Sequence, residues 1–227
     1  MSNSKFIEEL IKAHNEYRAK HQHASPLKHA QDLSDYAQNW ANHLIATNSF
    51  EHSDCDLNGQ RLGENIASKW SSGPTDYTGQ EPTDSWYSEI AKYDFNEASF
   101  KNGTGHFTQV VWKGSQEIGA ASATDGKGKW IAVASYRPAG NMMGDFARNV
   151  LPPKDGKIMI PAKKEMTNTG HTGVENMQHH GGGGGRQTKS YTRTKDGVTT
   201  TYVEETIVNP DGSRTTKTHT TTTNSSR

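Results

Sequence analysis

Two histidines and two glutamates have the residue types and the local sequence of a small polar site. His52, Glu64 and His106 lie in the short segments 51–53, 63–65 and 105–109, and Glu89 shares a face with apolar residues of a predicted helix. Neutral imidazole nitrogens bind divalent ions, while a carboxylate orients a ligand or takes a proton from a bound water. These four side chains, called the tetrad below, are candidates for a divalent-metal site. Their spacing alone does not show that they meet.

Simpler interpretations exist for each residue around the tetrad. The chain has 11 histidines, and an individual histidine is more often exposed or hydrogen-bonded locally than a ligand. Ser53 follows His52, but sequence neighbours need not pair, and no G-x-S-x-G elbow is present. Cys55 is interpreted as a small apolar residue, and His179 with His180 as solvated linker.

Three amphipathic helices are predicted to position these residues. Apolar side chains recur every three or four positions over residues 4–21 and again from Leu33 to about Asn48. A third helix is predicted to start at Pro82, with Trp86 and Glu89 on one face. A carboxylate on such a face is unusual and marks Glu89 as a residue with a specific role.

The strand signals indicate an α+β fold. Residues 118–124 and 130–136 are rich in Ala and Val and are joined by the polar loop 125–129, which predicts a β-hairpin. A shorter strand is predicted at residues 65–67. This order favours a small helix-sheet-helix sandwich over a parallel βαβ array. No glycine-rich phosphate-binding motif is present, so no nucleotide cofactor is expected.

Composition divides the chain into a domain and a tail. Residues 1–155 hold every Phe, Trp and Leu and are expected to form one domain. Residues 156–189 include five consecutive glycines and are expected to be a flexible linker. The Thr-rich segment 190–227 has turn signals at 196–197 and 209–212 and is expected to be disordered or a marginal β-meander.

Charge and cysteine content exclude several classes of protein. The formal net charge is zero, which gives no reason to expect nucleic-acid binding. Cys55 is the single cysteine, so a disulfide-stapled secreted scaffold is excluded. The first residues lack the apolar run of a signal peptide, and Ser2 stands where myristoylation requires glycine. We therefore expect a cytoplasmic protein rather than an extracellular one.

Several motifs of the chain resemble the CAP superfamily of cysteine-rich secretory, antigen 5 and pathogenesis-related proteins. Residues 105–115 (GHFTQVVWKGS) match one family signature throughout, and residues 135–142 (SYRPAGNM) match most of a second. Shorter motifs extend the resemblance over residues 5–153 and lie at 14–18, 63–65 and 86–89. Within the family, the chain is most similar to a Golgi-associated member. Ala134 replaces a usual cysteine of the second signature, which agrees with a reducing compartment.

The resemblance implies an α-β-α sandwich of the CAP/SCP type, with a low-complexity C-terminal tail in this chain. It also implies a large cleft into which His52, Glu64, Glu89 and His106 project. His52 and His106 would then be the ligands of a weakly held zinc ion, since two imidazoles make an incomplete first shell. The structural alternative is that members of the tetrad hydrogen-bond neighbouring backbone and support the sheet edge.

Two functional hypotheses follow. The first is a non-enzymatic intracellular binding protein whose partner is a lipid, a membrane surface such as the Golgi, another protein or a second copy of the chain. The second is a metal-dependent peptidase or esterase, in which Glu64 or Glu89 takes a proton from a metal-bound water. Catalytic zinc ordinarily has three protein ligands and only two histidines are placed here, so the first hypothesis is preferred.

Overall fold

The computed structural model describes two parts of the chain at different levels of detail. Residues 3–71 and 76–161 are described in full, and the backbone alone is described for 186–195, 198–208 and 214–224. The contacts within the chain divide it into two units, 1–67 with 75–166 and 68–74 with 167–227. His179 and His180 of the expected linker lie outside the described residues.

Helical elements bear two of the four tetrad residues, Glu89 and His106. The helices are α1 (Asn3–Lys20), α2 (Gln31–Thr47), α3 (Gln80–Ser88) with the 3-10 turn η1 (Glu89–Lys92), α4 (Gly105–Val111) and α5 (Phe146–Asn149). The first two confirm the prediction to within two residues. The third begins two residues before Pro82 and ends at Ser88, so Glu89 opens the 3-10 turn. Within the described residues, no helix combines the length and the apolar character needed to cross a bilayer.

A four-stranded sheet forms the centre of the first unit. Its order is β1-β5-β6-β4, with β1 (Lys28–His29), β5 (Glu117–Thr124), β6 (Lys129–Arg137) and β4 (Gly63–Trp70). The predicted hairpin is confirmed, since β5 and β6 pair antiparallel up to Thr124 opposite Trp130. The strand predicted at 65–67 extends over eight residues. A small separate hairpin, not predicted, joins β2 (Asp56–Leu57) to β3 (Gln60–Arg61).

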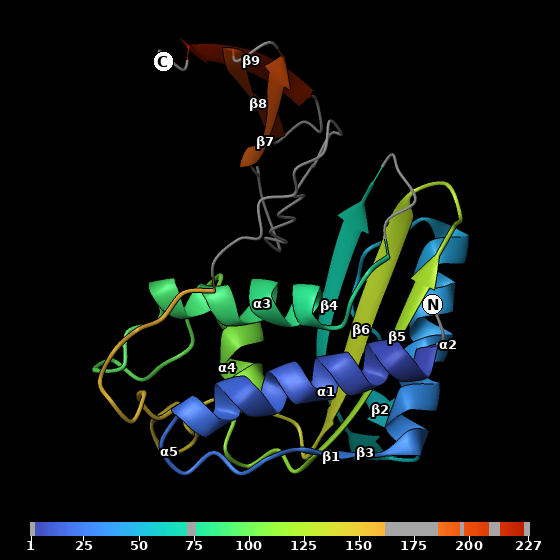
Figure 1. The fold of residues 1–227 in the computed structure, drawn as a ribbon, viewed down its shortest axis with the longest axis vertical. Coiled ribbons are helices and arrows are strands. Elements are labelled where there is room, and N and C mark those ends of the chain that lie inside the picture. The colour runs from blue at the N-terminus through green and yellow to red at the C-terminus, as the bar shows by residue number, and fades with distance from the viewer. Residues whose placement is uncertain (1–2, 72–75, 162–185, 196–197, 209–213, 225–227) are drawn as a thin grey trace. The chain divides into compact units, whose positions relative to one another are not determined.

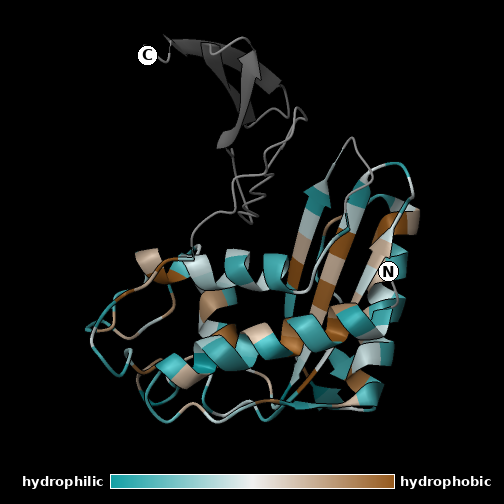
Figure 2. Cartoon of the chain, viewed as in Figure 1, coloured by the Kyte–Doolittle hydropathy of each residue, from teal (hydrophilic) through white to brown (hydrophobic). Residues whose placement is uncertain are grey.

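Consecutive residues of β5 point to opposite faces of the sheet, and each face carries helices (Figure 1). Ala120 belongs to the core under α1, α3 and α4, which includes Phe6, Trp86 and Phe107. Its neighbour Ala121 belongs to the core under α2. Figure 2 shows hydrophobic residues concentrated on the central strands, while the helices alternate hydrophobic and hydrophilic residues. The fold is therefore the expected α-β-α sandwich.

Small residues allow α2 to approach the sheet closely. A Cβ atom added at Gly119 of β5 would lie 2.1 Å from the backbone nitrogen of Ser34 and 2.4 Å from Cβ of Leu33. Both residues lie in the first turn of α2. Gly119 thus sets the distance between this helix and the strand.

β1 pairs only with Glu117 and Ile118 of β5, and the rest of this edge of β5 is covered by side chains from two helices. Asn3 of α1 accepts from the amide of Ser122 at 3.3 Å, and Ser34 of α2 accepts from the amide of Ala120 at 3.1 Å. Gln38 donates to the carbonyl of Ser122 at 3.3 Å and also accepts from the Asn3 side chain. Edge groups that would otherwise be free to pair with another strand are therefore occupied.

The second unit contains a three-stranded antiparallel meander. Its strands are β7 (Arg186–Lys195), β8 (Val198–Val208) and β9 (Arg214–Asn224), in the order β7-β8-β9. The two predicted turn signals fall between consecutive strands. β7 begins four residues before position 190, inside the segment expected to be linker.

Candidate functional site

His52 and Glu64 form the first of two His–Glu pairs. Nδ1 of His52 lies 2.7 Å from Oε1 of Glu64, which also accepts from the backbone amide of Ser53 at 3.0 Å. The hydroxyl of Ser53 donates to Oε2 at 2.7 Å. The Glu64 side chain is 1% exposed and that of His52 is 55% exposed. A buried carboxylate thus holds an imidazole that faces solvent.

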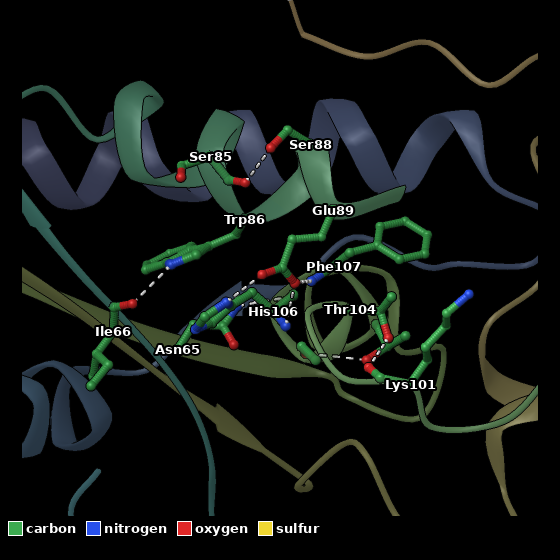
Figure 3. Close-up of polar contacts among 12 residues, drawn as sticks. Asn65, Ile66, Ser85, Trp86, Ser88, Glu89, Lys101, Thr104, His106 and Phe107 are labelled. Atoms are coloured by element: carbon green, nitrogen blue, oxygen red, sulfur yellow. Dashed lines mark hydrogen bonds and ion pairs between the residues drawn. The ribbon is translucent and has the colours of Figure 1, made fainter. Parts of the chain in front are cut away.

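His106 and Glu89 form the second pair, which has the same design (Figure 3). Nδ1 of His106 lies 2.8 Å from Oε1 of Glu89. Oε2 accepts from the backbone amides of His106 at 2.9 Å and Phe107 at 3.2 Å, the first amides of α4 after Gly105. Glu89 therefore satisfies amides that have no partner inside the helix and places a negative charge at the positive end of its dipole.

The other end of α4 is held by a buried arginine. Nη1 of Arg18, on α1, donates to the carbonyls of Val110 at 3.0 Å and Trp112 at 2.8 Å. The guanidinium is fully buried, and desolvation lowers its pKa to about 10. It stays charged at neutral pH and stabilises the negative end of the helix dipole. The helix that carries His106 is thus fixed at both ends.

A buried hydrogen-bond network connects the two pairs to the core. Asn65 donates through Nδ2 to the carbonyl of His106 and to the hydroxyl of Tyr136, both at 3.1 Å. Asn65 directly follows Glu64 on β4, so two consecutive residues of one strand hold the two pairs. Nε2 of His14 lies 2.8 Å from the Tyr136 hydroxyl, and its Nδ1 lies 2.8 Å from the carbonyl of Leu10.

The protonation state of His14 follows from its partners. The carbonyl of Leu10 can only accept, so Nδ1 carries the proton and Nε2 accepts from the Tyr136 hydroxyl. Burial lowers the pKa of His14 to about 3. The ring is neutral at physiological pH, and the network is fully satisfied without a buried charge.

The tetrad side chains have suitable chemistry for a weak metal site. In both pairs Nδ1 bonds to a carboxylate, the arrangement that ligating histidines commonly have, and it leaves Nε2 with a lone pair. Within the described residues, Nε2 of His52 and Nε2 of His106 have no protein partner. No group of three or more His, Cys, Asp and Glu side chains gathers for a metal anywhere in that part of the chain. Two imidazoles and water would have to suffice.

Sequence reasoning found the four ionisable residues but missed the groups that hold them. Asn65 was noted only as part of a motif, although it links β4 to α4. Arg18 lies one helical turn after His14 on the buried face of α1. A charged residue on an apolar helix face was the signal that marked Glu89, and the same signal was available for Arg18.

Comparison with known proteins gives matches that centre on the first unit. The model of the family described as CAP, cysteine-rich secretory protein family, matches residues 11–136. Golgi-associated plant pathogenesis-related protein 1 of Homo sapiens is 44% identical over 155 residues, which cover 67% of this chain and 97% of that protein. Protein PRY2 of Saccharomyces cerevisiae is 38% identical over 149 residues, covering 65% of this chain and 41% of that protein.

Among solved structures, BmVAL-1 superimposes with a TM-score of 0.53 at 27% identity. The match covers 63% of this chain and 80% of BmVAL-1.

Proposed function

The chain belongs to the CAP family, and on that premise we propose that it is a non-enzymatic binding protein that associates with a membrane surface. Its tetrad would hold a divalent ion weakly at His52 and His106. A protein partner is the second class of ligand that this proposal includes.

The observation that carries the non-enzymatic part of the proposal is the hydrogen bonding of the two carboxylates. Glu64 and Glu89 each accept three hydrogen bonds from protein donors, one from an imidazole and the others from backbone amides or the Ser53 hydroxyl. A general base needs a lone pair directed at the water or substrate proton. Carboxylates engaged in this way favour a structural role over a catalytic one, which weakens the hydrolase hypothesis.

The metal part of the proposal depends on the histidines alone. A bound Zn²⁺ would supply a positive charge and an exchangeable water at this surface. His52 and His106 would bind it through Nε2, with Glu64 and Glu89 fixing the orientation of the two rings.

The location proposed for the protein is the cytoplasmic side of the Golgi or of other membranes. The name of the human relative includes Golgi association, and the chain covers 97% of that relative.

Vesicle co-sedimentation of the full chain tests this function. We expect binding to vesicles that contain phosphatidylserine, weaker binding to pure phosphatidylcholine, and no turnover of generic ester or peptide substrates with or without zinc. Zinc-dependent hydrolysis that is lost in Glu64→Gln or Glu89→Gln would overturn the non-enzymatic assignment. Failure to bind any vesicle would overturn the membrane assignment.

A further inference from the structure

Three consecutive large apolar side chains are exposed after the last helix. Ile158, Met159 and Ile160 have exposed fractions of 50, 56 and 58%, and they lie in no helix or strand. The other exposed large apolar residues of the described part of the chain are Trp70, Phe100, Met142 and Met143. Ile158–Ile160, called the apolar strip below, is thus the longest uninterrupted exposed apolar segment among them.

The chain just before the strip is attached to α1. The amide of Lys154 donates to the carbonyl of Lys20 at 2.9 Å, and its Nζ donates to the carbonyl of Ala19 at 2.8 Å. Gly156 then adopts a positive φ of 69° in a turn, and its backbone amide donates to the carbonyl of Pro153. The strip follows directly after this turn, so it extends from a fixed point on the domain.

Positive charge surrounds the strip in the sequence. Lys154 and Lys157 precede it, Lys163 and Lys164 follow it, and Asp155 is the single acidic residue between positions 154 and 164. The whole chain has zero net charge, so this excess is local. Apolar side chains flanked by lysines match the two layers of an anionic membrane surface, acyl chains below and charged headgroups above.

We propose that the apolar strip inserts into the interface of an anionic phospholipid bilayer, with Lys157 at the headgroups. This inference rests on the membrane association proposed above and names the segment responsible for it. The strip attaches the domain at the C-terminal end of α1, where Lys154 holds the chain.

A bilayer fits the strip better than a protein groove does. The strip lies in no helix or strand, and its three side chains are exposed to similar extents, so no single face of it is marked out for a groove. A fluid interface can surround all three side chains at once.

The test compares two double variants of the full chain in vesicle co-sedimentation. The first replaces Ile158→Ser and Ile160→Ser, and the matched control replaces Met142→Ser and Met143→Ser, which are also exposed but lie outside the strip. With phosphatidylserine-containing vesicles at about 0.1 M salt, we expect the first variant to lose about tenfold or more of the wild-type partition coefficient, because less apolar surface is buried. The control should bind as wild type does.

The outcomes separate this inference from the proposed function. Both variants should keep the wild-type melting temperature, since the substituted side chains are exposed. If the wild type binds and the strip variant binds equally well, the strip is not the anchor, although membrane association stands. If the wild type binds no vesicle of either composition, the anchor is overturned together with the membrane assignment, and the strip is a candidate for a protein partner instead.

Discussion

Glu89 contacts His106 at two points, since one carboxylate oxygen accepts from the ring and the other from the backbone amide of the same residue. The start of α4 and the orientation of the imidazole are therefore determined together. Glu64 does the same across two residues, accepting from the His52 ring and the Ser53 amide. Each histidine is thus positioned before any ligand arrives.

Zinc titration tests the role of these histidines. We expect His52→Ala and His106→Ala to abolish the modest zinc affinity of the full chain, since either change leaves one imidazole. Glu64→Gln and Glu89→Gln should weaken binding less, because both imidazole ligands remain and the change at the site is in their orientation. Isothermal titration calorimetry measures all four. If neither histidine change alters zinc binding, the tetrad is purely structural.

Removing the charge of Glu64 should destabilise the fold. The carboxylate is almost fully buried and accepts three hydrogen bonds, and a Gln amide nitrogen would face at least one of those donors. The expected loss for Glu64→Gln is about 1–3 kcal/mol in urea unfolding. Glu51→Gln, at an exposed position nearby, is the control and should change stability by less than about 0.5 kcal/mol. Equal stability of the two variants would contradict this structural role.

Buried histidines should make the domain sensitive to acid. Burial lowers the pKa of His14 from 6.5 to about 3 and also lowers that of His21. The unfolded chain therefore binds protons below pH 6.5 that the folded chain does not. Stability is full above pH 6.5 and falls as the pH drops toward 3, by about 1.4 kcal/mol per pH unit for His14 alone.

Denaturant unfolding at several pH values checks this slope. His14→Phe will lower the stability at neutral pH, because the Tyr136 hydroxyl loses the acceptor of its proton. Its stability should nevertheless fall less steeply between pH 6 and about 4.5 than that of the wild type. Parallel slopes for the two proteins would show that His14 does not titrate as proposed.

Truncation locates the end of the domain. A chain ending after Lys154 keeps its contacts with Ala19 and Lys20, so its melting temperature should lie within a few degrees of the full chain, a change of about 1 kcal/mol or less. A chain ending after Leu151 also loses the Pro152 carbonyl that accepts from Gln22, and it should melt lower. Loss of cooperative unfolding in the chain that ends after Lys154 would mean that the Thr-rich segment contributes to the domain.

Gly119→Ala should be strongly destabilising. The added methyl group would overlap the first turn of α2, so the helix would have to move away from β5. We expect a loss of about 3 kcal/mol or more in thermal or urea unfolding. Gly105→Ala, where the nearest atom would lie at 3.6 Å, is the matched control and should be nearly neutral. A mild effect at Gly119 would mean that α2 and the sheet separate easily.

The sequence predicted the long elements well and the short ones poorly. α1, α2 and the β5–β6 hairpin have a clear period or a strong turn signal, and each is present at the predicted position. α4 was missed because its seven residues are buried on nearly every side, which leaves no amphipathic period to detect. It is instead stabilised at its ends by Glu89 and Arg18, residues distant in sequence.

For the site, the sequence identified the residues but not the partners of each residue. The motifs identified His52, Glu64, Glu89 and His106, but not which histidine pairs with which glutamate. That pairing depends on how the chain returns from His52 to β4 and on η1 packing against α4, contacts between residues 12 and 17 positions apart. The tautomer of His14 likewise depends on Leu10 and Tyr136, and no local sequence pattern encodes the second of these.

The covered edge of β5 has a consequence for biosynthesis. Asn3, Ser34 and Gln38 precede their partners in β5 by 119, 86 and 84 residues. A ribosome therefore completes both covering helices long before it releases the strand that they protect. The strand can therefore be covered as soon as it emerges. This limits its pairing with strands of neighbouring chains that are being made on the same messenger.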